Sequence, residues 1–281
     1  TQSMSTKLLA VFPIIVFACL FVYLGVQSAT FFSLGTFELI AKQAVPTVIV
    51  ALGLATVVIA GGDDVVAGGI DLSIPATAII CAAIIADQLT NQGNSLVFAM
   101  TLAFGAAAII GAINAFLVVG LRMTPLLATL AMSVTIVGVT KVITSSRRIG
   151  VTDETIIFIR DGDIFGIAAS VVMTAVLVVI FYHALHRTKW GMNMQATGGS
   201  RDAAEISGIL TRRFVVQCFL IAAFAGWIAS VFVLARGSGS SPGTEENMLL
   251  EMVLATFLGA AFSPRRVVTL WGAVLGAVVV S

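Results

Sequence analysis

Three aspartates lie close together in a chain that is otherwise mostly apolar. They are Asp63, Asp64 and Asp71, in the stretch GGDDVVAGGIDLSIP at residues 61–75. A carboxylate within a membrane protein is costly, which makes it a candidate for carrying a proton or a cation. A carboxylate can also cap a helix, because its oxygens accept the free N–H groups of the first turn. Asp71 directly precedes an apolar segment that opens with LSIP, and this position favours the capping role.

Few other side chains in the sequence are arranged for catalysis or metal binding. His183 and His186 are one helical turn apart, but no cysteine or acidic third ligand follows nearby, so we interpret them as interfacial anchors. The three cysteines lie singly in separate apolar segments, which fits neither a disulfide framework nor a zinc site. The sequence contains no G-x-x-x-x-G-K-[ST] phosphate loop. We therefore expect no catalytic residue, no metal and no cofactor on this chain.

The composition indicates where these residues act. The 281 residues are 59% hydrophobic and 10% charged, with a mean hydropathy of +1.08, whereas soluble domains carry roughly 25% charged residues. The net charge of +1 and the lack of a basic run argue against nucleic acid as a partner. We expect an all-α polytopic transmembrane bundle in contact with lipid, forming a single domain over residues 1–281.

Nine apolar segments are candidates for membrane-crossing helices. They are 8–26, 44–60, 72–86, 96–120, 123–141, 164–182, 214–235, 247–263 and 267–281. The second and third are short and are separated by the glycine-rich stretch with the aspartates, so we expect a broken helix there. The last segment simply stops, so we expect about ten spans in the complete protein, with a C-terminal span missing from this chain.

Basic residues predict the orientation of the bundle. The loop at about 188–213 is rich in Lys and Arg, and the positive-inside rule places such a loop in the cytoplasm. Nine Lys and Arg then lie inside and six outside, while nine of the 14 acidic residues lie outside. In this orientation the N-terminus is cytoplasmic, and residues 61–71 lie at or below the cytoplasmic surface.

The same loop carries a helix signal. Asp202 and Glu205 have the spacing of a capping box, and Gly208 suits the residue after a helix end. The predicted helix of about one and a half turns is too short to be stable alone, so it needs a surface to rest against. A solvated loop with a transient turn is the alternative.

Four stretches resemble the permease subunits of ribose-type ABC importers. The segment GGIDLS, GAINAFLVVGLRMTPLLATL at 111–130 and GMNMQATGGSRDAAEISGI at 191–209 are similar to motifs of that family in the same order. LGAAFSPRRVVTLWGAVLGA at 258–277 resembles its C-terminal segment more weakly. This chain departs from the family in the inserted Asp63 and Asp64, and in Ser263-Pro264-Arg265-Arg266, which replace small residues.

The resemblance implies a permease subunit of an importer in the bacterial inner membrane. It implies a separate ATPase subunit that binds ATP and Mg, a periplasmic solute-binding protein, and a second permease chain that is identical or related. It also implies that the loop helix couples the permease to the ATPase. In this interpretation glycines form the sharp turn into the helix, alanines allow close approach and charged residues make polar contacts. The coupling residues are then Gly198, Gly199, Arg201, Asp202, Ala203, Ala204, Glu205 and Gly208.

Polar side chains in or beside the predicted spans are candidates for lining the path of a solute. They are Asp71, Ser73, Asn114, Thr129, Ser133 and Gln217. The alternative is that they form interhelical hydrogen bonds that hold the bundle together. The leading expectation for the solute is a sugar, with a branched-chain amino acid also open.

Two other functions compete with this reading. An ion-coupled secondary transporter would use Asp63, Asp64 or Asp71 to carry a proton or sodium ion. A membrane-embedded scaffold would bind partners and transport nothing.

Overall fold

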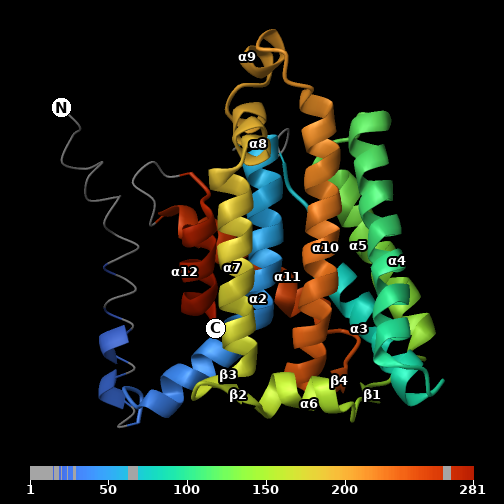
Figure 1. Cartoon of the computed structure of the whole chain (residues 1–281), viewed down its shortest axis with the longest axis vertical. Coiled ribbons are helices and arrows are strands. Elements are labelled where there is room, and N and C mark those ends of the chain that lie inside the picture. Colours follow the sequence, from blue (N-terminus) through green and yellow to red (C-terminus); the bar gives the residue numbers. More distant parts are fainter. Residues whose placement is uncertain are drawn as a thin grey trace.

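The computed structural model describes residues 15, 19, 21–23, 25–27, 30–62, 69–261 and 267–281. In these residues the chain is almost entirely helical, and its long helices run side by side as one bundle (Figure 1). Four strands of two residues each are the remaining regular structure there. The predicted all-α polytopic architecture is confirmed.

Eight described helices build the bundle. They are α2 (Leu34–Gly61), α3 (Ile74–Thr90), α4 (Leu96–Ala115) with its π-helical continuation η1 (Phe116–Gly120), α5 (Pro125–Ile143), α7 (Ala169–Arg187), α10 (Thr211–Gly237), α11 (Glu245–Ala261) and α12 (Leu270–Val280). The short elements are α6 (Glu154–Asp161), α8 (Lys189–Gly199), α9 (Arg201–Ile206), β1 (Ile149–Gly150), β2 (Asp163–Ile164), β3 (Ile167–Ala168) and β4 (Gly239–Ser240).

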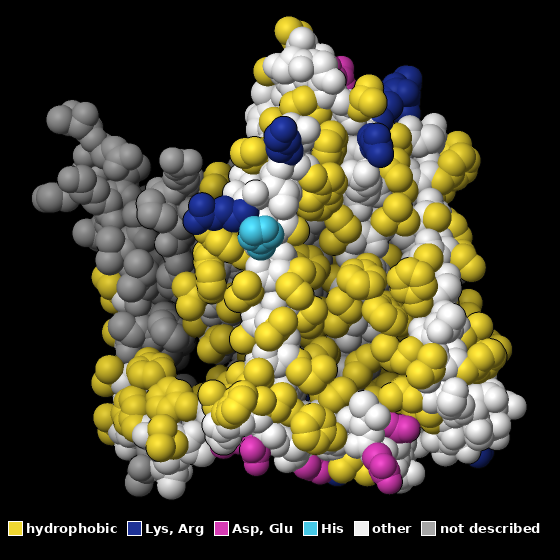
Figure 2. All heavy atoms as spheres, in the orientation of Figure 1, with side chains coloured by type: hydrophobic (Ala, Val, Ile, Leu, Met, Phe, Trp, Pro, Cys, Tyr) yellow, Lys and Arg dark blue, Asp and Glu magenta, His cyan; other side chains and the backbone are white. Residues whose placement is uncertain are grey.

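Five of the described helices are long and apolar enough to cross a membrane: α2, α4 with η1, α5, α7 and α10. The helices α3 and α12 are apolar but shorter. Burial separates the five into two groups, because 89% of the apolar window of α2 and 67% of that of α10 is buried, against 22% for α5. The core is therefore built around α2 and α10, while α4, α5 and α7 present apolar side chains to the outside, as Figure 2 shows for one face.

Small residues allow the core helices to approach closely. A Cβ added to Gly53 of α2 would lie 2.9 Å from the Cβ of Ala225 on α10. A Cβ added to Gly276 of α12 would lie 2.0 Å from the carbonyl oxygen of Ala255 on α11. Since lipid is as apolar as the helices, such close packing is a main source of helix association in membranes.

Most of the predicted spans correspond to helices, but α2 begins ten residues earlier than predicted. The side chain of Ser33 caps it by accepting a hydrogen bond from the N–H of Thr36, at 3.2 Å. Lys42 and Glu38 then form an i,i+4 ion pair at 2.7 Å, which suits a helix outside the hydrocarbon layer. Most of the predicted span 8–26 lies outside the described residues.

The two ends of the bundle differ. The helices α8 and α9 form one end, while α6 and the four strands lie at the other (Figure 1). On the face that Figure 2 displays, Lys and Arg gather near α8 and α9, and Asp and Glu gather at the α6 end.

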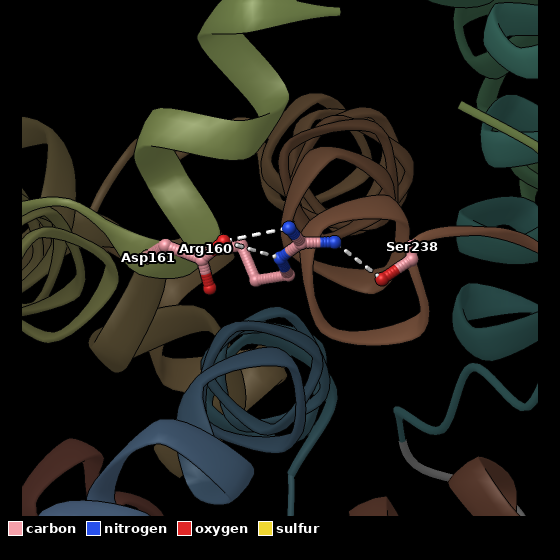
Figure 3. Close-up of polar contacts among 3 residues, drawn as sticks. All are labelled: Arg160, Asp161 and Ser238. Atoms are coloured by element: carbon pink, nitrogen blue, oxygen red, sulfur yellow. Dashed lines mark hydrogen bonds and ion pairs between the residues drawn. The ribbon is translucent and has the colours of Figure 1, made fainter. Parts of the chain in front are cut away.

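A small polar network fastens α6 to the end of α10 (Figure 3). Arg160 Nη1 donates to Ser238 Oγ at 2.6 Å, and Arg160 Nη2 donates to Asp161 Oδ2 at 2.6 Å. The hydrogen bond from Arg160 holds the pKa of the Asp161 carboxyl below its usual value. The antiparallel pair β1–β4 joins the same region to the connection after α5.

Candidate functional site

The chain re-enters the bundle between α2 and α3 without forming a helix. Residues 69–71 are non-helical and buried, and Figure 1 shows the chain descending from the α8 end before α3 begins. A Cβ added to Gly69 would lie 2.1 Å from the carbonyl oxygen of Val57 on α2. Non-helical backbone at membrane depth is tolerated where protein covers it or where it lines a water-filled cavity. The predicted break is present.

The break lies further inside the bundle than the predicted orientation implied. Asp71 was expected at or below the membrane surface, but it is 1% exposed and lies inside the bundle. Gly69 already lies beside Val57, four residues before the end of α2 at Gly61, which is about one helical turn inward. The segment runs back along α2 and carries Asp71 further in. The predicted orientation gave no indication of this return.

Four polar side chains hold the re-entrant segment, and we call them the junction cluster: Asp71, Ser73, Asn114 and Thr129. Asp71 Oδ1 accepts hydrogen bonds from Ser73 N at 2.8 Å and from Ser73 Oγ at 2.6 Å. Asn114 Nδ2 of α4 donates to Ser73 Oγ at 2.7 Å. Leu72 N donates to Thr129 Oγ1 of α5 at 3.1 Å. The cluster therefore ties the start of α3 to both α4 and α5.

The junction cluster is shielded from solvent in the isolated chain. Its side chains are between 0% and 1% exposed. Asn114 Oδ1 is buried without a hydrogen-bond partner among the described residues, which is costly for an amide oxygen. Asp71 accepts a backbone N–H next to a helix start, as predicted, although the residue directly before α3 is Ser73.

The other two predicted path residues lie elsewhere. Gln217 Oε1 accepts a hydrogen bond from Trp190 Nε1 at 2.8 Å, which connects α10 to α8. Ser133 is half-buried on α5. Of the six residues selected by type, the structure thus brings together the four that flank the broken helix.

The predicted short helix is present as α9, but its cap differs from the prediction. Ser200 Oγ accepts a hydrogen bond from the N–H of Ala203 at 3.4 Å, and Asp202 is inside the helix. Glu205 Oε1 accepts instead from Thr211 Oγ1 at 2.5 Å. Gly208 follows the helix with a φ of +79°, the left-handed conformation that suits a glycine there.

Helix α8 fills a region that was predicted as loop. Thr188 Oγ1 caps α8 by accepting a hydrogen bond from Gly191 N at 3.1 Å. A threonine is a common N-cap residue, so Thr188 was the signal in the sequence for the start of this helix. A Cβ on Gly198 would lie 2.0 Å from the carbonyl oxygen of Ile59, whereas a Cβ on Gly199 would meet nothing within 4 Å. Gly198 therefore seats α8 against α2, and the bend into α9 occurs at Ser200.

Helix α9 projects beyond the bundle (Figure 1), and apolar side chains on α9 and in the connection from α9 to α10 are exposed. Ile206 is 89% exposed and Leu210 is 69% exposed. Ala203 is exposed, whereas Ala204 is 4% exposed and faces the protein. Ala203 and Ala204 were predicted as coupling residues but Ile206 and Leu210 were not, although large apolar residues in a polar loop are themselves a signal of a contact surface.

A cavity of about 440 Å³ lies beneath α9. Its walls come from the end of α2, η1, the start of α5 and the start of α10. Arg122, Arg201 and Arg212 line it, with Glu205 as the acidic group among the described lining residues. In the described part of the chain no group of three His, Cys, Asp or Glu side chains is arranged to hold a metal.

The bundle, the re-entrant break and the projecting helix together define a multi-pass membrane protein with an internal discontinuous helix. The chain belongs to the family described as branched-chain amino acid transport system / permease component, which it matches over residues 36–281.

Several curated relatives are permeases of sugar transport systems. The chain is 28% identical to the ribose import permease protein RbsC of Escherichia coli (strain K12), with 88% of this chain and 77% of the relative covered. It is 26% identical to the L-arabinose transport system permease protein AraH of the same strain, covering 68% of this chain and 58% of the relative. It is 28% identical to that strain's galactofuranose transporter permease protein YtfT, covering 78% and 62%. The chain thus spans about 60% of the length of the latter two relatives. No solved structure matches the chain.

Proposed function

We propose that this chain is the permease subunit of a bacterial ABC importer and forms part of the path of a small solute, most favourably a sugar. The names of the ribose, arabinose and galactofuranose relatives support a sugar over a branched-chain amino acid. The family match supports the permease role. Nothing in these comparisons favours an ion-coupled carrier, and Asp63 and Asp64 lie outside the described residues.

The proposal places the protein in the bacterial inner membrane with its N-terminus and the α8–α9 end in the cytoplasm. A periplasmic solute-binding protein would deliver the solute to the α6 end. A second permease chain, identical or related, would complete the path. ATP and Mg would bind to a separate ATPase subunit, because the sequence has no phosphate loop.

The exposed apolar surface formed by α9 and its connection to α10 carries the proposal. Ile206 and Leu210 are exposed at the basic end of a membrane protein. Large exposed apolar side chains are typical of sites that bind another protein. We assign Ile206, Leu210 and Ala203 to the contact with the ATPase. Ala204, whose side chain is buried, and Gly198, which contacts α2, support α9 from below.

The test is co-purification of the ATPase from gently solubilised native membranes that contain the tagged chain. The variant Ile206→Asp places a charge in the contact and is expected to reduce ATPase recovery at least about tenfold, since a charge left unpaired in an apolar contact costs more than 1.4 kcal/mol. Uptake of the solute should fall with it.

Phe165→Asp is the matched control. Phe165 is 99% exposed, but it lies in the turn between β2 and β3, at the α6 end. This control should leave ATPase recovery unchanged. An Ile206→Asp variant that keeps its ATPase, or uptake that survives depletion of ATP, would overturn the proposal.

A further inference from the structure

The cavity beneath α9 has the charge and construction of an anion site. We propose that it binds a phosphate-class anion, held by Arg122, Arg201 and Arg212. The three arginines come from three different elements: the turn after η1, the first residue of α9 and the first turn of α10. Their convergence on one cavity of about 440 Å³ does not follow from the general excess of basic residues at this end.

The guanidinium groups are available to a ligand. The ion pairs among the described residues are Lys42–Glu38 and Arg160–Asp161, and both are remote from this cavity. Glu205 is the acidic side chain among the described residues that line it, and its Oε1 accepts a hydrogen bond from Thr211. Three positive charges against one negative charge leave the described lining with an excess of two positive charges. Arginine is the side chain that best matches the geometry of a phosphate group.

Two helix N-termini add to the positive potential. Thr124 and Pro125 at the start of α5, and Thr211 at the start of α10, line the same cavity. Neither N-cap residue, Thr124 or Leu210, forms a side-chain cap hydrogen bond. Pro125 has no N–H, and Thr211 N and Arg213 N of α10 already donate to the carbonyl oxygens of Ile209 and Leu210. These helices of 19 and 27 residues therefore contribute mainly the positive ends of their dipoles, which favour a bound anion.

The cavity is larger than a phosphate ion, and part of its wall is apolar. Val118, Val119, Val215 and Phe219 are among its lining residues. An organic phosphate fits this combination: its charged group contacts the arginines and its remaining part contacts the valines and the phenylalanine. Two sources present this chemistry, an anionic phospholipid headgroup and a phosphorylated solute in the cytoplasm. The apolar window of α5, whose first residue lines the cavity, is only 22% buried, which favours a lipid as the first source to test.

The test uses the purified full chain in detergent, stripped of lipid, with dioleoyl-phosphatidylglycerol and inorganic phosphate as separate probes. Native mass spectrometry counts bound lipid, and thermal unfolding reports stabilisation by phosphate. Arg212→Gln is expected to weaken binding of the bound probe about tenfold, the loss of one charge-assisted hydrogen bond. Arg122→Gln, on a different element, should do the same, so the result does not depend on one variant folding. Glu205→Gln removes the repulsive charge and should strengthen binding.

Arg213→Gln is the matched control, because Arg213 adjoins Arg212 on α10 but lines a different cavity. Binding of the lipid that Arg212→Gln weakens and Arg213→Gln spares would confirm the site and assign it to a headgroup. The same pattern with inorganic phosphate alone would confirm it and assign it to a soluble phosphate. The proposal would be overturned if neither probe binds. It would also be overturned if Arg212→Gln and Arg213→Gln weaken binding equally. This outcome is independent of the transport function, since neither measurement involves the ATPase or uptake.

Discussion

The hydroxyl of Ser73 is the link that connects the junction cluster. It donates to Asp71 Oδ1 and accepts from Asn114 Nδ2, so its removal breaks both side-chain bonds at once. Because the partners are at most 1% exposed, water does not readily replace the hydroxyl. We expect Ser73→Ala to lower the free energy of unfolding by about 1–3 kcal/mol, measured by thermal or denaturant unfolding of the purified chain in detergent.

Ser230→Ala is the control for this residue. Ser230 is also fully buried, but its Oγ donates to the carbonyl oxygen of Trp227 in the same helix, at 2.6 Å. Its loss breaks no link between elements and should cost less than about 1 kcal/mol. Equal costs for the two serines would mean that the junction cluster does not stabilise the re-entrant segment.

At the scale of elements, the contact between α8 and α2 depends on one glycine. A Cβ at position 198 would lie 2.0 Å from the Ile59 carbonyl oxygen, which is backbone and has no side-chain freedom to move away. We expect Gly198→Ala to push α8 off α2 and to lower the unfolding temperature by several degrees, since a 1 kcal/mol loss shifts a chain of this size by about 2–4 °C.

Gly199 provides an adjacent comparison. A Cβ there meets nothing within 4 Å, and alanine favours a helix over glycine by about 1 kcal/mol. Gly199→Ala should therefore leave the unfolding temperature unchanged or raise it. If both alanine variants behave alike, α8 is not seated on α2 in the way the structure describes.

Element boundaries show what the sequence predicts and what it misses. Long apolar runs located α4 with η1, α5 and α10 to within three residues and α7 to within five, because lipid forces such runs into helices. The start of α2 was missed because the Glu38–Lys42 pair continues the helix beyond the apolar run. Helix α8 was missed because it has no continuous apolar run: its buried residues Gly191, Met194 and Thr197 are mixed with polar ones such as Asn193 and Gln195.

The candidate site was predictable by residue type and not by arrangement. Hydropathy and glycine placement located the break and selected four residues of the junction cluster. The pairing of Ser73 with Asn114 joins positions 41 residues apart, which no local pattern encodes. The three arginines of the cavity come from separate elements for the same reason. The exposure of Ile206 was not predicted either, because isoleucine side chains are most often buried in folded proteins.

At the scale of the whole molecule, the charge difference between the ends predicts orientation. The α8–α9 end carries Arg187, Lys189, Arg201, Arg212 and Arg213, whereas acidic residues such as Asp153 and Asp163 lie at the α6 end. The positive-inside rule then puts α9 in the cytoplasm. Ser207→Cys beside α9 and Asp163→Cys on β2 place exposed thiols at opposite ends. Both are introduced after the native cysteines are replaced.

A membrane-impermeant maleimide should label the cysteine at position 163 in intact spheroplasts and the one at position 207 only after permeabilisation. Cys81 and Cys218 are buried, whereas Cys19 is exposed, so the replacement of Cys19 is the one that must be complete before labelling. The reversed pattern would place α9 outside the cell, where no ATP-driven subunit could reach Ile206. The opposite orientation would also bring the arginine cavity to the outer leaflet, away from cytoplasmic phosphates. One labelling experiment therefore tests whether α9 and the cavity face the cytoplasm, as both proposals require.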